Sequence, residues 1–187
     1  MNLPNRHAEF SASWSYANPA IVLHWILALL LFFMVPLGWY MTSIEDQPGS
    51  DWYFNLHKSI GITVFALVAL RLLWRLRHKP ENLPSSVPQW RANAASWTQH
   101  LLYLCMLILP ATGFTGALFS KDGVGFFGVA IAHPAPNHDL SELLFSIHGA
   151  AVWVLTALVL LHVAGGLKHL VIDRDGVFQR MWPKSSR

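Results

Sequence analysis

Charged residues and cysteines are both scarce in this chain of 187 residues. Asp, Glu, Lys and Arg make up 12% of it, about half of the roughly 25% found in soluble domains. The single cysteine, Cys105, excludes an intrachain disulfide, an iron–sulfur cluster held by several thiolates, and a haem attached through a C-x-x-C-H motif. Because 53% of the residues are hydrophobic, the composition indicates a membrane protein.

Four apolar runs are each long enough to cross a hydrocarbon core about 30 Å thick. They cover approximately residues 19–41, 52–76, 97–119 and 143–172. Little sequence is left for a soluble domain, so we predict an all-α fold: a single transmembrane domain built as an integral membrane four-helix bundle. The first run follows a mostly polar tail and has no small-residue cleavage pattern after it, so we expect a membrane anchor and not a removable signal peptide.

The distribution of basic residues predicts the topology. All Lys and Arg residues except Lys58 and Lys121 precede the first run, surround the Pro- and Ser-rich second connection, or lie at the end of the fourth run and after it. The first and third connections carry most of the acidic residues instead. By the positive-inside rule, the N- and C-termini are cytoplasmic. We therefore interpret the net charge of +3 as a solvated stripe facing lipid headgroups, with no nucleic-acid partner.

Four histidines lie at matched depths in three of the runs. His148 and His162 are fourteen positions apart in the last run, which places them on one helical face and about 21 Å apart along the axis. His24 lies near the cytoplasmic end of the first run, and His57 lies near the outer end of the second. Matching by depth predicts two pairs, His24 with His162 and His57 with His148.

Each predicted pair offers two imidazoles from different helices. That arrangement suits a haem b whose iron is bound axially on both sides, with no open coordination position. We predict that His24 and His162 bind the inner haem iron and that His57 and His148 bind the outer one. A four-histidine proton relay is an alternative, whereas a zinc site would need its ligands within a few Å of one another.

Small and basic residues near these histidines could serve the same cofactors. Ala28, Gly61 and Gly166 each lie one helical turn beyond a predicted ligand, where a small residue would let a flat ring approach the backbone. The candidates for binding haem propionates are Lys58, Arg71 and Arg75. Each arginine could instead be an interfacial anchor whose stem lies along apolar surface.

The same segments resemble those of the bacterial cytochrome b561 family. The matching motifs are VLHWILAL at His24, LHKSIGI at His57, SIHGAAVWVL at His148 and HVAGGLKHLVIDRDGVFQRM from His162. The resemblance covers nearly the whole chain and implies four helices with two b haems, ligated by these four histidines. It also implies one-electron transfer between ubiquinone and a partner outside the bacterial inner membrane, and in some members superoxide oxidation. The family's last helix often ends in two histidines, whereas here Leu170 follows His169.

We therefore expect a multi-pass superoxide:ubiquinone oxidoreductase. Superoxide would reduce the outer haem, and the inner haem would reduce ubiquinone. His100 and His169, both near the cytoplasmic ends of their spans, are candidates to bond or protonate the quinone. The alternative is that both are solvated interfacial rings. The acidic outer face would attract superoxide weakly, since only Lys58 and Lys121 oppose its charge.

Two other functions stay open at this point. The acidic outer face favours a cytochrome b relay subunit that exchanges electrons with a basic periplasmic redox protein. A structural membrane protein without a cofactor is the third hypothesis. A homodimer is compatible with all three functions.

Overall fold

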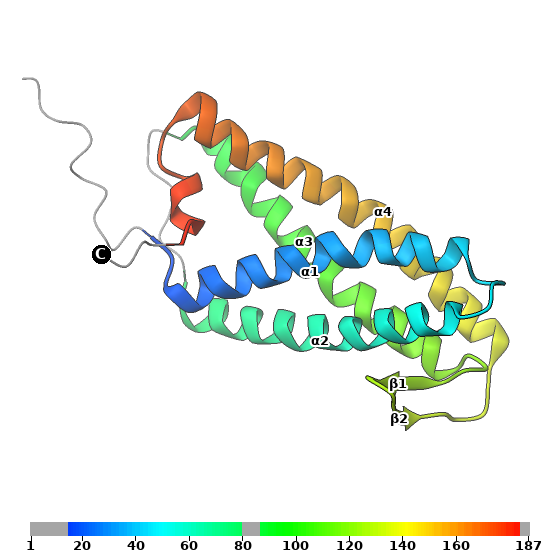
Figure 1. Cartoon of the computed structure of the whole chain (residues 1–187). Coiled ribbons are helices and arrows are strands. Elements are labelled where there is room, and N and C mark those ends of the chain that lie inside the picture. The colour runs from blue at the N-terminus through cyan, green and yellow to red at the C-terminus, as the bar shows by residue number, and fades with distance from the viewer. Residues whose placement is uncertain (1–14, 80–86, 184–187) are drawn as a thin grey trace, which may run out of the picture.

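The computed structural model describes residues 15–79 and 87–183, and four long helices dominate them (Figure 1). These are α1 (Asn18–Ser43), α2 (Ser50–Arg77), α3 (Gln89–Leu118) and α4 (His138–Lys168). An antiparallel hairpin of β1 (Val124–Phe126) and β2 (Val129–Ala132) joins α3 to α4. The π-helix η2 (His169–Asp173) and the 3-10 helix η3 (Phe178–Met181) follow α4. Residues 80–86 of the second connection and most of the N-terminal tail lie outside the described residues.

The helix ends follow local sequence signals. α1 has a proline, Pro19, in its first turn, where the missing N–H and the fixed φ cost nothing. α2 follows Gly49, whose φ of +88° favours glycine. At the start of α4, the Asn137 side chain accepts a hydrogen bond from the Leu140 N–H at 3.1 Å, as an N-cap residue does.

All four helices are long and apolar enough to cross a membrane. Large apolar side chains are exposed along each of them, among them Leu29, Leu70, Leu104 and Leu160. Such exposure is expected where lipid, and not water, surrounds a helix. The prediction of an all-α four-helix membrane bundle is confirmed.

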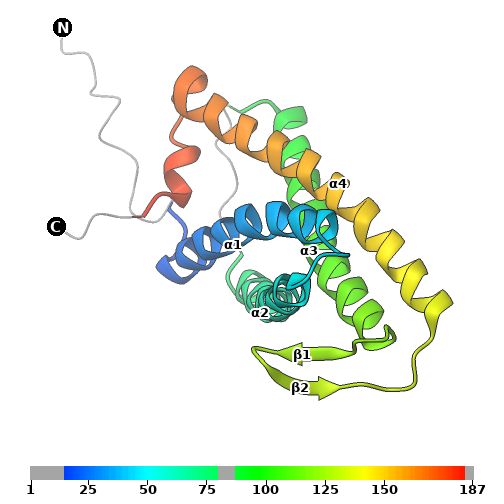
Figure 2. The ribbon, with the colours of Figure 1, turned by 45° about the vertical axis from the view of Figure 1, so that its right-hand side comes forward.

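The helices pack unevenly. α3 lies closely along α4, α1 lies along α2, and α2 lies along α3, whereas α4 makes almost no close backbone contact with α1 or α2 (Figure 2). Two small buried clusters hold the close pairs together. One is centred on Leu27, Val64 and Val68, and the other on Cys105, Leu109 and Leu155. The open side of the bundle is therefore the side on which α4 faces α1 and α2.

Two helices extend beyond their predicted apolar runs. α3 begins at Gln89 and not near 97, and α4 begins at His138 and not near 143. The extra turns are polar, and hydropathy detects only the part of a helix that is apolar. The hairpin in the third connection was not predicted either, because its residues, GVGFFGVAIA, lack the polar alternation of a typical half-buried strand.

The segment after α4 folds back onto the start of α1. The Trp25 indole N–H donates to the Met181 carbonyl at 2.7 Å, and the Tyr16 N–H donates to the Arg180 carbonyl at 3.2 Å. Arg180 is only 6% exposed, and its guanidinium lies 5.0 Å from the centre of the Tyr16 ring. The prediction that the basic residues form a solvated stripe is therefore wrong for Arg180, because this return of the chain buries it.

Candidate functional site

The structure brings the four histidines together as two pairs. His24 of α1 faces His162 of α4 with ring centroids 6.0 Å apart, and His57 of α2 faces His148 of α4 at 6.2 Å. The first pair lies toward the end of the bundle where α1 starts, here called the N-terminal end. The second pair lies toward the hairpin end. Both pairs bridge the side on which α4 stands apart from α1 and α2.

The spacing within each pair suits one metal ion between the rings. Imidazole nitrogens bind zinc at about 2.0–2.1 Å, and two rings on opposite sides of one ion at that distance would have centroids roughly 6.4 Å apart. The observed separations of 6.0 and 6.2 Å are close to this value. His162 is also exposed although it faces His24. These observations fit pairs of histidines that would each hold one metal-containing ring.

The hydrogen bonding of His148 leaves one ring nitrogen free to bind a metal. Its Nδ1 lies 2.8 Å from the carbonyl oxygen of Leu109. Because a carbonyl only accepts, Nδ1 carries the proton, and Nε2 keeps its lone pair. A backbone carbonyl on the second nitrogen is the usual way in which proteins orient a histidine ligand.

Two glycines press against the ring edges at the hairpin end. A Cβ built on Gly113 of α3 would lie 3.0 Å from the His148 ring, and one built on Gly38 of α1 would lie 3.3 Å from the His57 ring. Each ring therefore uses the space that a glycine leaves on the neighbouring helix. Within the described residues, the Nδ1 atom of His57 is the one buried side-chain nitrogen or oxygen without a hydrogen-bond partner.

Sequence reasoning selected other small residues and missed these two. A Cβ built on Gly61 would lie 3.8 Å from the Met34 side chain, and one built on Gly166 would lie 3.7 Å from the Phe178 side chain. Neither distance is to a histidine of the pairs. The only signal for the correct positions is that each follows a proline within its helix, Pro36 before Gly38 and Pro110 before Gly113.

An apolar layer lies between the two pairs. Leu155 is seven residues from both His148 and His162, so it shares their face of α4. It is 1% exposed and packs with Cys105 and Leu109 of α3. The two histidine pairs are therefore separate sites.

The basic candidates have different partners. Arg71 donates to the Ala20 carbonyl at 2.7 Å, and its other terminal nitrogen lies 3.4 Å from His24 Nδ1. Arg75 donates to the Gln99 side chain at 3.1 Å and lies over the Tyr103 ring. Lys58 donates to the Gly123 carbonyl at 3.1 Å, which ties α2 to the hairpin. Of the two arginines, Arg71 is the one in contact with a histidine of the pairs.

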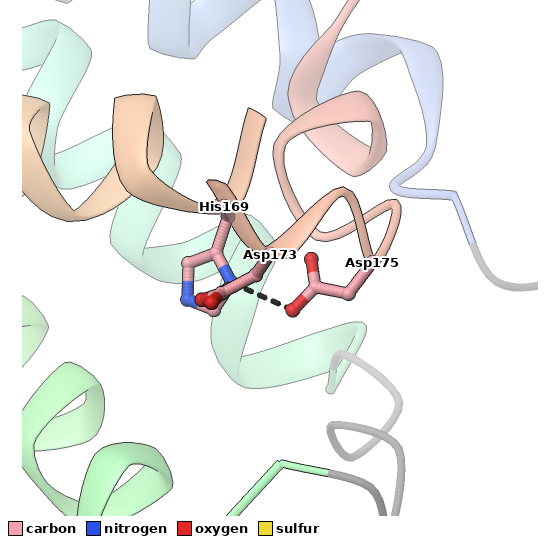
Figure 3. A group of neighbouring side chains, drawn as sticks. All are labelled: His169, Asp173 and Asp175. Carbon is pink, nitrogen blue, oxygen red and sulfur yellow. Dashed lines mark hydrogen bonds and ion pairs between the residues drawn. The ribbon is translucent and has the colours of Figure 1, made fainter. Parts of the chain in front are cut away.

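His169 lies in a cluster with Asp173 and Asp175 at the turn after α4 (Figure 3). Its Nδ1 is 2.7 Å from an Asp175 oxygen and 3.5 Å from an Asp173 oxygen. Asp173 also pairs with Lys168 and, at 3.6 Å, with Arg91 of α3. Lys168 and Arg91 already neutralise the charge of Asp173, so the cluster fits a histidine held in one orientation better than an open metal site. The π-helix that forms the turn is a feature often found at functional sites.

His100 has a simpler environment. Its Nδ1 is 2.7 Å from the Ser96 carbonyl oxygen, one turn earlier in α3, and the residue is exposed. His100 and His169 thus have different partners. Asp175, which sequence reasoning did not select, follows His169 in the segment HLVIDRD, and only the turn geometry reveals its contact with the ring.

Comparison with known proteins places this geometry in a family. The family model described as prokaryotic cytochrome b561 matches residues 15–184. Cytochrome b561 homolog 2 of Escherichia coli K12 is 34% identical, over 99% of this chain and 95% of the relative. Cytochrome b561 homolog 1 of the same strain is 27% identical, over 90% and 97%. A probable superoxide oxidase, CybB, of Yersinia pestis is 26% identical, over 90% and 96%.

A match across nearly the whole chain agrees with the four apolar helices and the paired histidines. The chain therefore belongs to the prokaryotic cytochrome b561 family, haem b proteins that carry electrons in the bacterial inner membrane, which it crosses several times.

Proposed function

We propose that this protein holds two b haems and passes single electrons across the membrane to the ubiquinone pool, most specifically as a superoxide:ubiquinone oxidoreductase. The observation that carries the proposal is the presence of two histidine pairs toward opposite ends of one face of α4. The ring centroids are 6.0 Å apart within one pair and 6.2 Å apart within the other. His24 and His162 would hold the haem at the N-terminal end, and His57 and His148 would hold the haem at the hairpin end.

A haem with two histidine ligands supplies a one-electron iron couple and offers no open position for oxygen. The protein's own residues would set its orientation. The Leu109 carbonyl keeps His148 in the tautomer whose Nε2 can bind a metal. Arg71, beside His24, and Lys58, beside His57 in the sequence, are the cations that could bind propionates, and Arg75 is a third candidate.

The charge pattern supports placing the hairpin end in the periplasm and both termini in the cytoplasm. Superoxide would lose one electron at the hairpin-end site and leave as oxygen. Two such electrons, together with two protons, would convert one quinone into quinol at the N-terminal end. The name of the relative from Yersinia pestis supports superoxide as the donor.

The quinone site proposed here lies beside His169. With its Nδ1 held by the Asp175 carboxylate, the Nε2 of His169 is oriented to bond or protonate a quinone oxygen. His100 is the second candidate, because its exposed ring lies on the same end of the bundle. The carboxylate partner favours His169, since it fixes the orientation of the ring.

The second candidate function is a relay subunit for a periplasmic redox protein. Its support is the exposed acidic residues at the hairpin end, which would attract a basic partner. They include Asp51, Asp122, Asp139 and Glu142.

Haem content and superoxide kinetics together test the proposal. His148→Ala and His162→Ala should each lose about one of two haems by alkaline-pyridine spectrum while the other stays bound. His133→Ala, which replaces an exposed hairpin-end histidine, should keep both. Stopped-flow mixing of the wild-type protein with superoxide should then reduce the haems. Full haem content in both pair variants would refute the site, and haem that superoxide does not reduce would favour the relay function.

A further inference from the structure

The hairpin between α3 and α4 exposes several large apolar side chains. No polar side chain occurs between Asp122 and His133. Phe127 is 61% exposed, Val129 69% and Ile131 52%. All three residues Val129, Ala130 and Ile131 of β2 are exposed, although a strand covered on one face would alternate. In water, such a strand with a free edge would be an aggregation hazard.

The hairpin is fixed against the side of α2 and does not project beyond its end (Figure 1). The Phe127 N–H donates to the Ser59 hydroxyl at 2.9 Å, and that hydroxyl donates to the Asn55 carbonyl at 2.7 Å. Ser59 is 1% exposed. It lies nine residues after Ser50, the first residue of α2, and therefore about 13 Å along the helix axis. The hairpin tip thus lies beside the body of a membrane helix.

The length of α2 sets the depth of the tip. A helix of 28 residues is about 42 Å long, which exceeds a hydrocarbon core of about 30 Å by roughly 6 Å at each end. With α2 centred in the core, a tip about 13 Å from the helix start lies roughly 7 Å inside the hydrocarbon boundary, a depth that interfacial segments reach, and not in bulk water.

The residues that flank the hairpin have the opposite character. Lys121 and Asp122 precede it, His133 follows it, and all three are exposed. The hairpin is therefore apolar at its tip and outer strand and polar at its base, which is the pattern of a segment lying in a membrane interface. The hairpin is hydrogen-bonded to α2, a helix that also exposes large apolar side chains.

We propose that the hairpin, residues 123–132, is an interfacial anchor whose apolar face lies in the lipid leaflet at the hairpin end of the bundle. Ser59 holds it in register with α2. The occupant of its exposed face is lipid, and neither a soluble partner nor a second copy of this chain. This inference does not depend on the haem or quinone assignments, because it rests on the hairpin and α2 alone.

Cysteine reactivity in proteoliposomes tests the proposal that the hairpin lies in lipid. Val129→Cys and Ile131→Cys would be made in a Cys105→Ser background and labelled with a charged, membrane-impermeant maleimide or with N-ethylmaleimide. Controls are Gln47→Cys, exposed in the first connection, and Leu160→Cys, exposed on α4. The charged reagent should label the two hairpin positions at least about tenfold more slowly than Gln47→Cys, because lipid excludes ions. Leu160→Cys should show the same slow labelling.

Two results would overturn the proposal. One is labelling of both hairpin positions by the charged reagent at the rate of Gln47→Cys, which would mean that the face is in water. The other is protection that disappears when the protein is diluted in lipid, which would identify a second copy as the occupant. Adding Ser59→Ala should raise charged labelling of Val129→Cys, because the Phe127 N–H loses its acceptor, whereas adding Thr63→Ala should not, because Thr63 bonds within α2.

Discussion

The imidazole of His148 lies against the backbone of Gly113, so close that a Cβ at that glycine would come within 3.0 Å of two ring atoms. This is tighter than nine in ten real Cβ contacts, so alanine at position 113 requires the ring to move by a few tenths of an ångström. Because the ring is also held by the Leu109 carbonyl, the displacement would break its alignment with His57. We expect Gly113→Ala to lose about one haem, the one at the hairpin end, while the other stays bound. A haem-to-protein ratio with a low-temperature spectrum measures this.

Two matched variants separate this effect from a general loss of stability. Gly149→Ala is adjacent to His148 in the sequence but meets nothing within 4 Å, and it should keep both haems. Gly38→Ala would place its Cβ 3.3 Å from the His57 ring, so it should weaken the same haem less than Gly113→Ala does. Equal loss in Gly113→Ala and Gly149→Ala would contradict the steric explanation.

A second prediction concerns the Asp175 carboxylate. Asp175→Asn keeps the shape of the side chain but removes the charge that faces His169 Nδ1. Quinone reduction should slow by about tenfold, and His169→Gln should slow it by about a hundredfold, a typical loss for a general acid. Haem content and the rate of haem reduction from the hairpin end should not change. Single-turnover oxidation of the reduced protein by a soluble quinone measures the step.

His100→Gln is the matched control for the quinone prediction. Among the residues that the structure describes, His100 bonds only to the Ser96 carbonyl and hydroxyl of its own helix, so its loss should change the rate by less than about twofold. A slow His100→Gln variant together with a normal His169→Gln variant would move the quinone site to α3.

A third prediction tests electrostatic attraction of superoxide. Lys58 follows His57 directly in the sequence, is half-buried, and donates a hydrogen bond to the Gly123 carbonyl. Lys58→Met should lower the bimolecular rate of haem reduction by superoxide about three- to tenfold at low salt. The difference should shrink at high ionic strength, because salt screens the attraction. Lys121→Met, which removes an exposed charge at the hairpin base, should have a smaller effect. A deficit that does not depend on salt would indicate a local structural change instead.

The histidine pairing was predictable because it depends on quantities that sequence carries directly. Helical periodicity places His148 and His162 on one face of α4, and the apolar runs assign a depth to His24 and His57. The structure brings together these four residues in the expected combination. The ligand role itself stays a prediction that the haem measurements above would test.

The features that escaped prediction depend on contacts between distant segments. Gly38 and Gly113 matter only because a ring from another helix reaches them, and nothing in their own segments specifies which ring. The sequence pattern predicted Arg180 to be a solvated cation, but the return of the chain onto α1 buries it. The hairpin escaped because its strands have no polar alternation, and its bond to Ser59 joins residues that are 68 positions apart.

The last prediction separates the two arginines at the N-terminal end. Arg71 touches His24, whereas Arg75 is engaged with Gln99 and Tyr103. A cation near a haem favours the electron-rich reduced form, so removing it lowers the midpoint potential. Arg71→Gln should lower the potential of one haem by about 60 mV, the equivalent of a tenfold change for a one-electron couple. Arg75→Gln should lower it clearly less. Potentiometric titration of both variants measures these shifts, and a larger shift in Arg75→Gln would assign the propionate contact to Arg75 instead.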